Sequence, residues 1–433
     1  MAKLSGPVVA VGLRYTAIAI QFLILSLIAH HFSRHDYGLY ILALSAVLPV
    51  FPLLGLGASE YVVREMPRLD AIHDRHARQD MAGTMLGVMI LSVGIALGAA
   101  LLAAAILPLD NQQRTMLWFA TGFFIANGVM FNCAQLLLAL DRHGLGAFFN
   151  YPAINIGLIA VSAPYMLLTS APNFTGLAAA TVSGASAMAL WALVLTLRSG
   201  GRPRFRLSPA LRQVAIGIRL AIARTLYGVG LWLPTFLAGI LLNPADAGIL
   251  GTAGRLSVAV SAAMAAVRFS IRPAIVRAAQ RDDMDAIAAL CGRLGTISLA
   301  LCIVAMTATL LVGRPAIALA FGPGFDAVVP VLAILLLAVA IECFGGPVDE
   351  VLKMTGTQDG ALAILAAGIV LLTCASWLLS TSGLFALASA QVLYSLFVFG
   401  LMLLLARKRL GIWLRPRLTS LAAVSNPGSR GNA

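Results

Sequence analysis

Charged side chains are scarce in this sequence. Only 11% of its 433 residues are Asp, Glu, Lys or Arg, whereas ordinary soluble domains carry about 25%. Hydrophobic residues make up 60%, and the mean hydropathy is +0.93. This balance excludes an ordinary water-soluble domain and indicates a chain that lies largely in lipid.

Two signatures of other function classes are missing as well. The sequence contains no G-x-x-x-x-G-K-[ST] motif, so direct use of ATP through a P-loop is not expected. Its five cysteines form no C-x-x-C pair and all fall inside apolar runs, where a free cysteine packs as a small hydrophobic residue. We therefore expect neither disulfides nor a metal site. The cysteines are Cys133, Cys291, Cys302, Cys343 and Cys374.

Long apolar runs are what the sequence has in abundance. A helix needs roughly 20 apolar residues to cross a hydrocarbon core of about 30 Å. The run LSVGIALGAALLAAAIL at 91–107 does not alternate polar and apolar residues, which argues against a membrane β-barrel. We predict an all-α polytopic membrane protein, because helices satisfy their own backbone groups in lipid. About twelve transmembrane helices are expected, at residues 8–30, 38–60, 82–107, 115–140, 148–169, 174–197, 213–242, 247–270, 287–312, 328–352, 360–380 and 383–406.

The distribution of basic residues predicts the orientation of these spans. With the N-terminus in the cytoplasm, 22 Lys and Arg residues fall on the cytoplasmic side and only three, Arg34, Arg114 and Arg314, on the other. An even number of spans then places both termini in the cytoplasm. The formal net charge of +13 is explained by this bias and by attraction to anionic headgroups, so no nucleic-acid partner is expected.

A basic stretch, RSGGRPRFRLSPALR, divides the twelve spans into six and six. The predicted organisation is an N-terminal six-helix lobe at 1–197, a cytoplasmic linker at 198–212, a C-terminal six-helix lobe at 213–406 and a cytoplasmic tail at 407–433.

The two halves share a spaced pattern. Arg14 lies 22 residues before Asp36, Arg224 lies 22 residues before Asp246, and each Asp is followed two residues later by glycine. The second copy follows the first by 210 residues, the difference between 36 and 246. Because each copy covers the first helical hairpin of a half, we interpret the halves as pseudo-symmetric repeats.

The first copy overlaps a polar segment, HHFSRHDYGLYILALSA at 30–46. We interpret it as a helix connection in which Asp36 caps the second helix. A proton-sensing role for His30, His31 and His35 is the alternative. A metal site is disfavoured, since no carboxylate or cysteine stands at ligand spacing from them.

The stretch FSRHDYGLYILALSAVLPVFPLLGLGASEYVVREM resembles the N-terminal signature of the polysaccharide-export flippases, within the multidrug/oligosaccharidyl-lipid/polysaccharide (MOP) exporter superfamily. RDDMDAIAALCGRLGTISLALCIVAM and LAFGPGFDAVVPVLAILLLAVAI resemble the second half of that family. The resemblance extends from about residue 10 to residue 406.

This resemblance implies twelve helices in two six-helix lobes around a central cavity. It also implies an activity: translocation of undecaprenyl-diphosphate-linked oligosaccharide repeat units from the cytoplasmic to the outer leaflet of a bacterial inner membrane, by alternating access. The polysaccharide polymerase and chain-length regulator proteins would then be possible partners. No cofactor is expected, and a proton or sodium gradient would supply the energy.

A diphosphate head needs cations inside the membrane, and three arginines are candidates. Arg255 is expected roughly 12 Å deep in the eighth span, at about 1.5 Å per residue, which is too deep to reach water easily. Arg14 and Arg224 occupy equivalent places in the repeat. The alternatives are a structural ion pair for Arg255 and interfacial headgroup contacts for Arg14 and Arg224.

Glu342, in the tenth span, is the candidate for ion coupling, because a buried carboxylate can exchange a proton in the physiological range. Pairing with Arg255 would instead make it structural. Glu60, near the inner end of the second span, is a further carboxylate candidate, with pairing to Arg64 one turn away as the alternative.

Further candidates are amides for sugar hydroxyls and helix breakers for hinges or gates. The amides are Asn127, Asn132 and Gln135, for which interhelical hydrogen bonding is the alternative. The hinge or gate candidates are Pro49, Pro52, Pro234, Gly345, Gly346, Pro347, Asp349 and Glu350.

Two competing functions remain. An ion-coupled drug antiporter of the same superfamily would favour an acidic or aromatic cavity, which the intramembrane arginines oppose. A membrane glycan polymerase or glycosyltransferase would need a substantial outer loop or a catalytic carboxylate loop, and the predicted outer loops are short. We therefore expect a transporter and not an enzyme.

Overall fold

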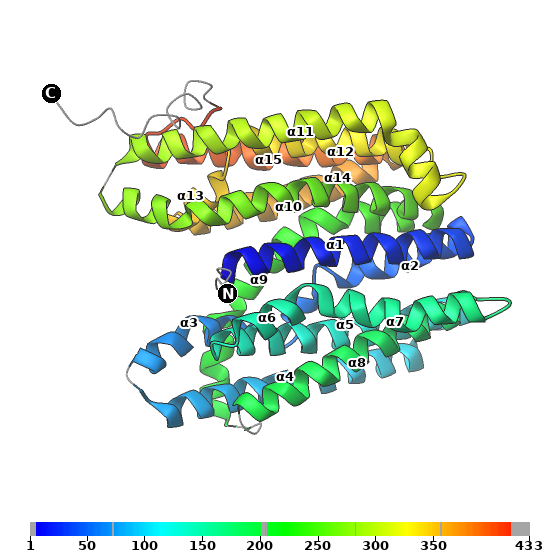
Figure 1. The fold of residues 1–433 in the computed structure, drawn as a ribbon, viewed down its shortest axis with the longest axis horizontal. Coiled ribbons are helices and arrows are strands. Elements are labelled where there is room, and N and C mark those ends of the chain that lie inside the picture. The colour runs from blue at the N-terminus through cyan, green and yellow to red at the C-terminus, as the bar shows by residue number, and fades with distance from the viewer. Residues whose placement is uncertain are drawn as a thin grey trace, which may run out of the picture. The chain divides into compact units, whose positions relative to one another are not determined.

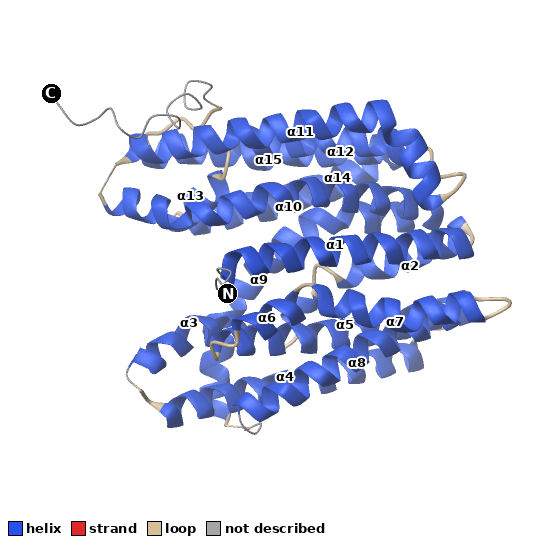
Figure 2. Cartoon of the chain, viewed as in Figure 1, coloured by secondary structure: helices blue, strands red, loops and turns tan. Residues whose placement is uncertain are grey.

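The computed structural model describes residues 6–71, 73–200, 204, 206–281, 283–355 and 357–416. Throughout this part of the chain the regular structure is helical (Figures 1 and 2). The prediction of an all-α polytopic membrane protein is confirmed. Lys3 and most of the predicted tail lie outside the described residues.

The chain forms two compact units, residues Met1–Trp232 and Leu233–Ala433, and their boundary falls inside one helix, α9. The N-terminal unit contains α1 (Gly6–His31), α2 (Arg34–Val47), the 3₁₀ turn η1 (Phe51–Leu53), α3 (Ala58–Ala71), α4 (Arg75–Ile106), α5 (Asn111–Ala139), α6 (His143–Asn150), α7 (Pro152–Leu168), α8 (Phe174–Gly200) and most of α9 (Leu207–Leu241). The C-terminal unit contains α10 (Pro244–Gln280), α11 (Met284–Phe321), α12 (Val328–Phe344), α13 (Val348–Met354), α14 (Gln358–Leu379), the 3₁₀ turn η2 (Ser380–Ser382) and α15 (Leu384–Leu410).

Among the described residues, nine segments are long and apolar enough to cross a membrane, and α6 with α7, bent by 52°, would make a tenth. Helix α10 covers the predicted span at 247–270, and α12 together with α13 covers the one at 328–352. Helix α15 runs on to Leu410, so the predicted tail begins with helical residues.

Three predicted spans are interrupted. The second one ends as a helix at Val47, passes through Pro49, η1 and two glycines, and resumes at α3. Proline lacks an amide donor, and Gly55 and Gly57 have φ values of 86° and 81°, which favour glycine. The sequence there cannot continue a helix.

The other interruptions follow the same chemistry. Between α12 and α13, Gly345 caps the first helix, Gly346 has a φ of 60° and Pro347 precedes the second. The bend between α6 and α7 lies at Tyr151, directly before Pro152. Pro234, by contrast, lies inside the continuous helix α9.

The cap of α2 differs from the prediction. Ser33, not Asp36, is the N-cap: its Oγ accepts the Asp36 amide at 3.1 Å and donates to Asp36 Oδ2 at 2.9 Å. The same arrangement recurs 210 residues later, where Asn243 Oδ1 accepts the Asp246 amide at 3.0 Å. The hydroxyl or amide three residues before each Asp places the carboxylate in the first turn.

Glycines allow close helix packing within the N-terminal unit. Helix α7 packs against α8, and a Cβ built on Gly184 would lie 2.1 Å from the Gly157 carbonyl oxygen. A Cβ on Gly217 of α9 would lie 2.0 Å from the carbonyl oxygen of Gly57. Small residues at such crossings are typical of membrane helices, whose backbones approach closely.

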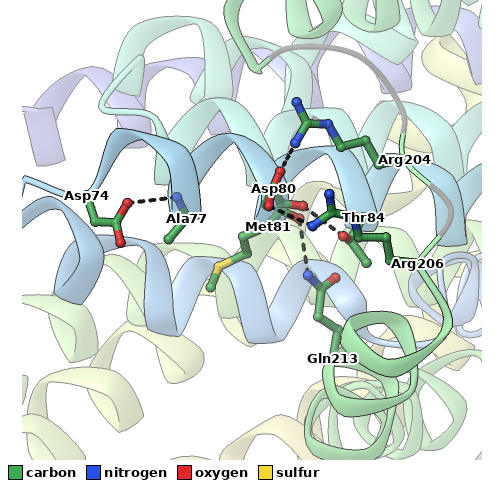
Figure 3. Close-up of polar contacts among 8 residues, drawn as sticks. All are labelled: Asp74, Ala77, Asp80, Met81, Thr84, Arg204, Arg206 and Gln213. Carbon is green, nitrogen blue, oxygen red and sulfur yellow. Dashed lines mark hydrogen bonds and ion pairs between the residues drawn. The ribbon is translucent and has the colours of Figure 1, made fainter.

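The predicted linker is tied back to α4 (Figure 3). Asp80 forms ion pairs with both Arg204 and Arg206, the latter at 3.1 Å. The Arg204 amide donates to the Gly83 carbonyl at 2.8 Å, and Gln213 Nε2 donates to the Met81 carbonyl at 3.1 Å. The described part of this connection is therefore anchored on the N-terminal unit.

We predict that Gly184→Ala destabilises the protein by about 1–3 kcal/mol, because the new methyl overpacks a backbone contact. The matched control is Gly98→Ala in α4, where a Cβ meets nothing within 4 Å. Urea or thermal unfolding in detergent measures both. Equal stability of the two variants would contradict the close contact.

Candidate functional site

Two adjoining cavities of about 280 and 240 Å³ lie within the N-terminal unit. They share the lining residues Leu48, Phe51, Asn127, Asn150 and Ile154. The walls therefore come from the broken segment after α2, from α5, and from the bend between α6 and α7. Helix α9 adds Arg224 and Gly228 to the larger cavity and Trp232 to the smaller one.

The broken segment creates part of this space. Pro49 and Pro52 line the larger cavity. Gly228 approaches Pro49 so closely that a Cβ there would lie 2.9 Å from the proline Cα. Two of the hinge candidates thus border a cavity, as expected for a discontinuous helix in a transporter.

The lining carries several amides. Asn127 is 7% exposed and borders both cavities, whereas Gln21 and Asn155 border the smaller one. Asn155 Nδ2 donates to the Ala17 carbonyl of α1 at 2.9 Å, which fixes its orientation. Amides of this kind can exchange hydrogen bonds with hydroxyl groups. The sequence interpretation missed Asn150, Asn155 and Gln21, whose shared surface becomes visible only after folding.

Arg224 is the cation of the larger cavity. Its Nε lies 3.0 Å from Glu60 Oε1, and its Cζ lies 5.0 Å from the ring centroid of Phe131. The Arg224 side chain is 45% exposed and that of Glu60 is 13% exposed. An arginine stacked on an aromatic ring keeps its N–H groups in plane for anions.

The alternative pairing of Glu60 with Arg64 is wrong. Glu60 pairs with Arg224 instead, and Arg64 Nε lies 3.7 Å from Glu65 Oε1. Helical spacing favoured the local partner, but tertiary packing supplied a distant one.

Two of the predicted sugar contacts form hydrogen bonds within the protein. Asn132 is fully buried, and its Nδ2 donates to the Leu54 carbonyl at 2.6 Å and the Gly128 carbonyl at 2.8 Å. It therefore satisfies the backbone of the broken segment. Gln135 is 7% exposed, and its Nε2 lies 3.5 Å from Asn150 Oδ1 on the cavity wall.

The remaining candidates are not gathered at this cavity. Arg14 is half-buried on α1 and does not line either cavity. Arg255, 3% exposed on α10, and Glu342, half-buried on α12, belong to the C-terminal unit. Asp349 and Glu350 of α13 are 7% and 9% exposed, beyond the Gly345–Pro347 break.

Two of the three histidines, His30 and His31, make local contacts. His30 Nδ1 lies 2.8 Å from the Ser26 carbonyl and His31 Nδ1 lies 2.9 Å from the Leu27 carbonyl, each one turn back in α1. His35 Nε2 lies 3.2 Å from Gln112 Nε2. Within the described ranges, no three His, Cys, Asp or Glu side chains are grouped to hold a metal ion.

Sequence comparison gives no relative: no protein-family model and no curated protein matches the chain. Solved structures do match. One, described as the inward-facing conformation of a multidrug resistance MATE family transporter of the MOP superfamily, aligns over 98% of this chain and 100% of its own, with a TM-score of 0.73 and 12% identity. The chain has the fold of a MOP superfamily transporter.

Two further MOP structures support this assignment. An outward-facing MATE family transporter matches with a TM-score of 0.60 and 13% identity, covering 94% of this chain and 95% of its own. A MOP superfamily transporter from Pyrococcus furiosus gives the same values, and its description states that a binding pocket of reversed polarity suggests a different function. At such identities the likeness to MOP proteins establishes the fold alone.

We predict that Asn132→Ala lowers the free energy of unfolding by about 1–3 kcal/mol, because the buried Leu54 carbonyl loses its donor. Asn127→Ala, on the cavity wall one turn and a half earlier in α5, should cost clearly less. Denaturant unfolding in detergent compares them. If Asn127→Ala proves as costly as Asn132→Ala, the division into a structural and a cavity-facing amide is wrong.

Proposed function

We propose that the protein is a flippase that translocates undecaprenyl-diphosphate-linked oligosaccharide units from the cytoplasmic to the outer leaflet. The observation that carries the proposal is the combination of Arg224 with several amides on two adjoining cavities of a MOP fold. A phosphate needs a cation, sugar hydroxyls need hydrogen-bonding groups, and the polyprenyl tail can stay in lipid.

Arg224 suits a diphosphate better than a lysine would. Its guanidinium is planar, always charged and able to donate two parallel hydrogen bonds to phosphate oxygens. Its partner Glu60 holds it at the cavity and neutralises it when no cargo is present. An arriving diphosphate would compete with this single carboxylate for the guanidinium.

Arg14 and Arg255 are proposed as further phosphate contacts during transport, and Asn127 as a sugar contact. Asn132 and Gln135 are proposed to act on the cargo only through the segments they support. We propose that the breaks at Pro49–Pro52 and Gly345–Pro347, with Pro234, Asp349 and Glu350, serve as hinges or gates for alternating access.

An ion-coupled drug antiporter is the second candidate. It is favoured by the MATE family matches, which are described as multidrug transporters, and by the carboxylate of Glu60 beside aromatic Phe131. A cationic drug would bind to the carboxylate of Glu60, whereas a diphosphate would bind to the guanidinium of Arg224. The same two residues therefore separate the candidates.

The setting proposed with this function is a bacterial inner membrane with both termini in the cytoplasm. The protein would receive its cargo there and deliver it to a polysaccharide polymerase and chain-length regulator. Neither ATP nor a bound cofactor is required in this scheme, because an ion gradient drives transport.

The deciding experiment measures translocation of lipid-linked oligosaccharide in proteoliposomes. We expect Arg224→Gln to lower the rate at least tenfold, since losing a charge-assisted hydrogen bond costs about 1.5–3 kcal/mol. Arg219→Gln, on the same helix but away from the cavity lining, should transport normally. Arg255→Ala extends the test to the C-terminal unit.

Folding is controlled with Glu60→Gln/Arg224→Gln, which removes both charges and leaves no unpaired partner. Transport by Arg224→Gln at the wild-type rate would overturn the role of Arg224. Failure of the wild type with lipid-linked glycans, together with cation efflux lost in Glu60→Gln, would favour the antiporter.

Glu342 is proposed as the coupling residue. We predict that Glu342→Gln abolishes the dependence of transport on an imposed proton or sodium gradient while downhill exchange of cargo continues. Glu342 is half-buried on α12, where a neutral glutamine occupies nearly the same volume. Undiminished gradient-driven transport by this variant would exclude it.

A further inference from the structure

The C-terminal unit contains a polar cavity of its own. It has a volume of about 530 Å³ and lies where α15 ends and α11 begins. Figure 1 shows the segment that follows α15 beside the start of α11. The lining side chains with polar or aromatic groups are Asp285, Arg407, Trp413 and Arg415.

The segment after α15 has a fixed conformation beside this cavity. Gly411, with a φ of 69°, ends the helix in a left-handed cap, and its amide donates to the Arg407 carbonyl at 3.1 Å. Ile412 and Leu414 are then 6% and 1% exposed, whereas Trp413 is 42% exposed. Alternate residues thus anchor this segment in the unit and leave the others at the surface.

The charges of the cavity favour an anion. Arg407 and Arg415 contribute two guanidinium groups against the one carboxylate of Asp285. The Arg407 Cζ lies 4.9 Å from the ring centroid of Trp413, so the ring fixes the guanidinium by its face. The N–H groups point outward in the plane of the guanidinium, where they can donate hydrogen bonds to phosphate oxygens.

The cavity also lies at the end of a helix that is long enough to place it among lipid headgroups. Helix α15 has 27 residues, so at about 1.5 Å per residue it spans roughly 40 Å, close to the 40–45 Å of a bilayer with its headgroups. Trp377, at the opposite end of the α14–α15 hairpin, is 69% exposed. Exposed tryptophans at both ends of this hairpin match the aromatic belts at the two membrane surfaces.

We propose that this cavity binds the headgroup of an anionic phospholipid of the phosphatidylglycerol type. Arg407 and Arg415 hold the phosphodiester, Trp413 lies at the headgroup level, and Asp285 accepts hydrogen bonds from the headgroup hydroxyls. The lipid is a bound component of the membrane and not the transported cargo, so this site is independent of the proposed flippase activity.

The test is native mass spectrometry of the full chain in detergent, titrated with phosphatidylglycerol. We expect Arg407→Gln/Arg415→Gln to weaken binding at least tenfold. The matched control, Lys408→Gln/Arg409→Gln, removes the same amount of charge from the last turn of α15, at residues outside the lining. Its affinity should stay within about twofold of the wild type. Arg415→Gln alone, which keeps the stacked Arg407, should fall between them.

Three results would overturn the proposal. Equal weakening in both double variants would show only a general attraction of basic residues for anionic lipid. Equal affinity for phosphatidylethanolamine would exclude recognition of an anionic headgroup. Displacement of phosphatidylglycerol by millimolar glycerol phosphate, with equal affinity for the soluble ester, would assign the cavity to soluble phosphate esters.

Discussion

Hydrocarbon offers no hydrogen-bond partner to a peptide group, and the N-terminal unit depends on how it meets this constraint. Its second span is interrupted between Val47 and Ala58, which releases backbone groups inside the protein. The Asn132 side-chain amide donates a hydrogen bond to one of these groups, the Leu54 carbonyl. Gly55 and Gly57, with positive φ values, permit the turn. The cavity exists because this break is both tolerated and buried.

The corresponding helix in the second half, α10, has no such break. The positions 210 residues after Pro49 and Pro52 hold Ala259 and Ala262, and the helix there runs unbroken from Pro244 to Gln280. Alanine is the best helix former, whereas proline is the worst. The repeats therefore share their caps, at Ser33 and Asn243, but only the first has a broken second span.

Much of this fold can be predicted from the sequence, because a segment that crosses lipid must be long, apolar and helical. Apolar length and helix breakers locate the segments and several of their interruptions, including the one at Gly345–Pro347. Side-chain partners are harder, because they depend on packing between distant segments. Glu60 found Arg224 in place of Arg64, and Asn132 turned inward to the backbone although it shares helix α5 with the cavity-facing Asn127. Residue type alone could not separate these two asparagines.

Helix α9 belongs to the N-terminal unit as far as Trp232, although the second predicted repeat begins with this helix. Its Gly217 contacts Gly57, its Arg224 holds Glu60, and the connection before it is anchored on Asp80. The predicted repeat and the packing unit therefore differ by one helix. A gene split within the connection would yield a first fragment that lacks the cation of its own cavity, whereas a split after α9 would keep that cavity whole.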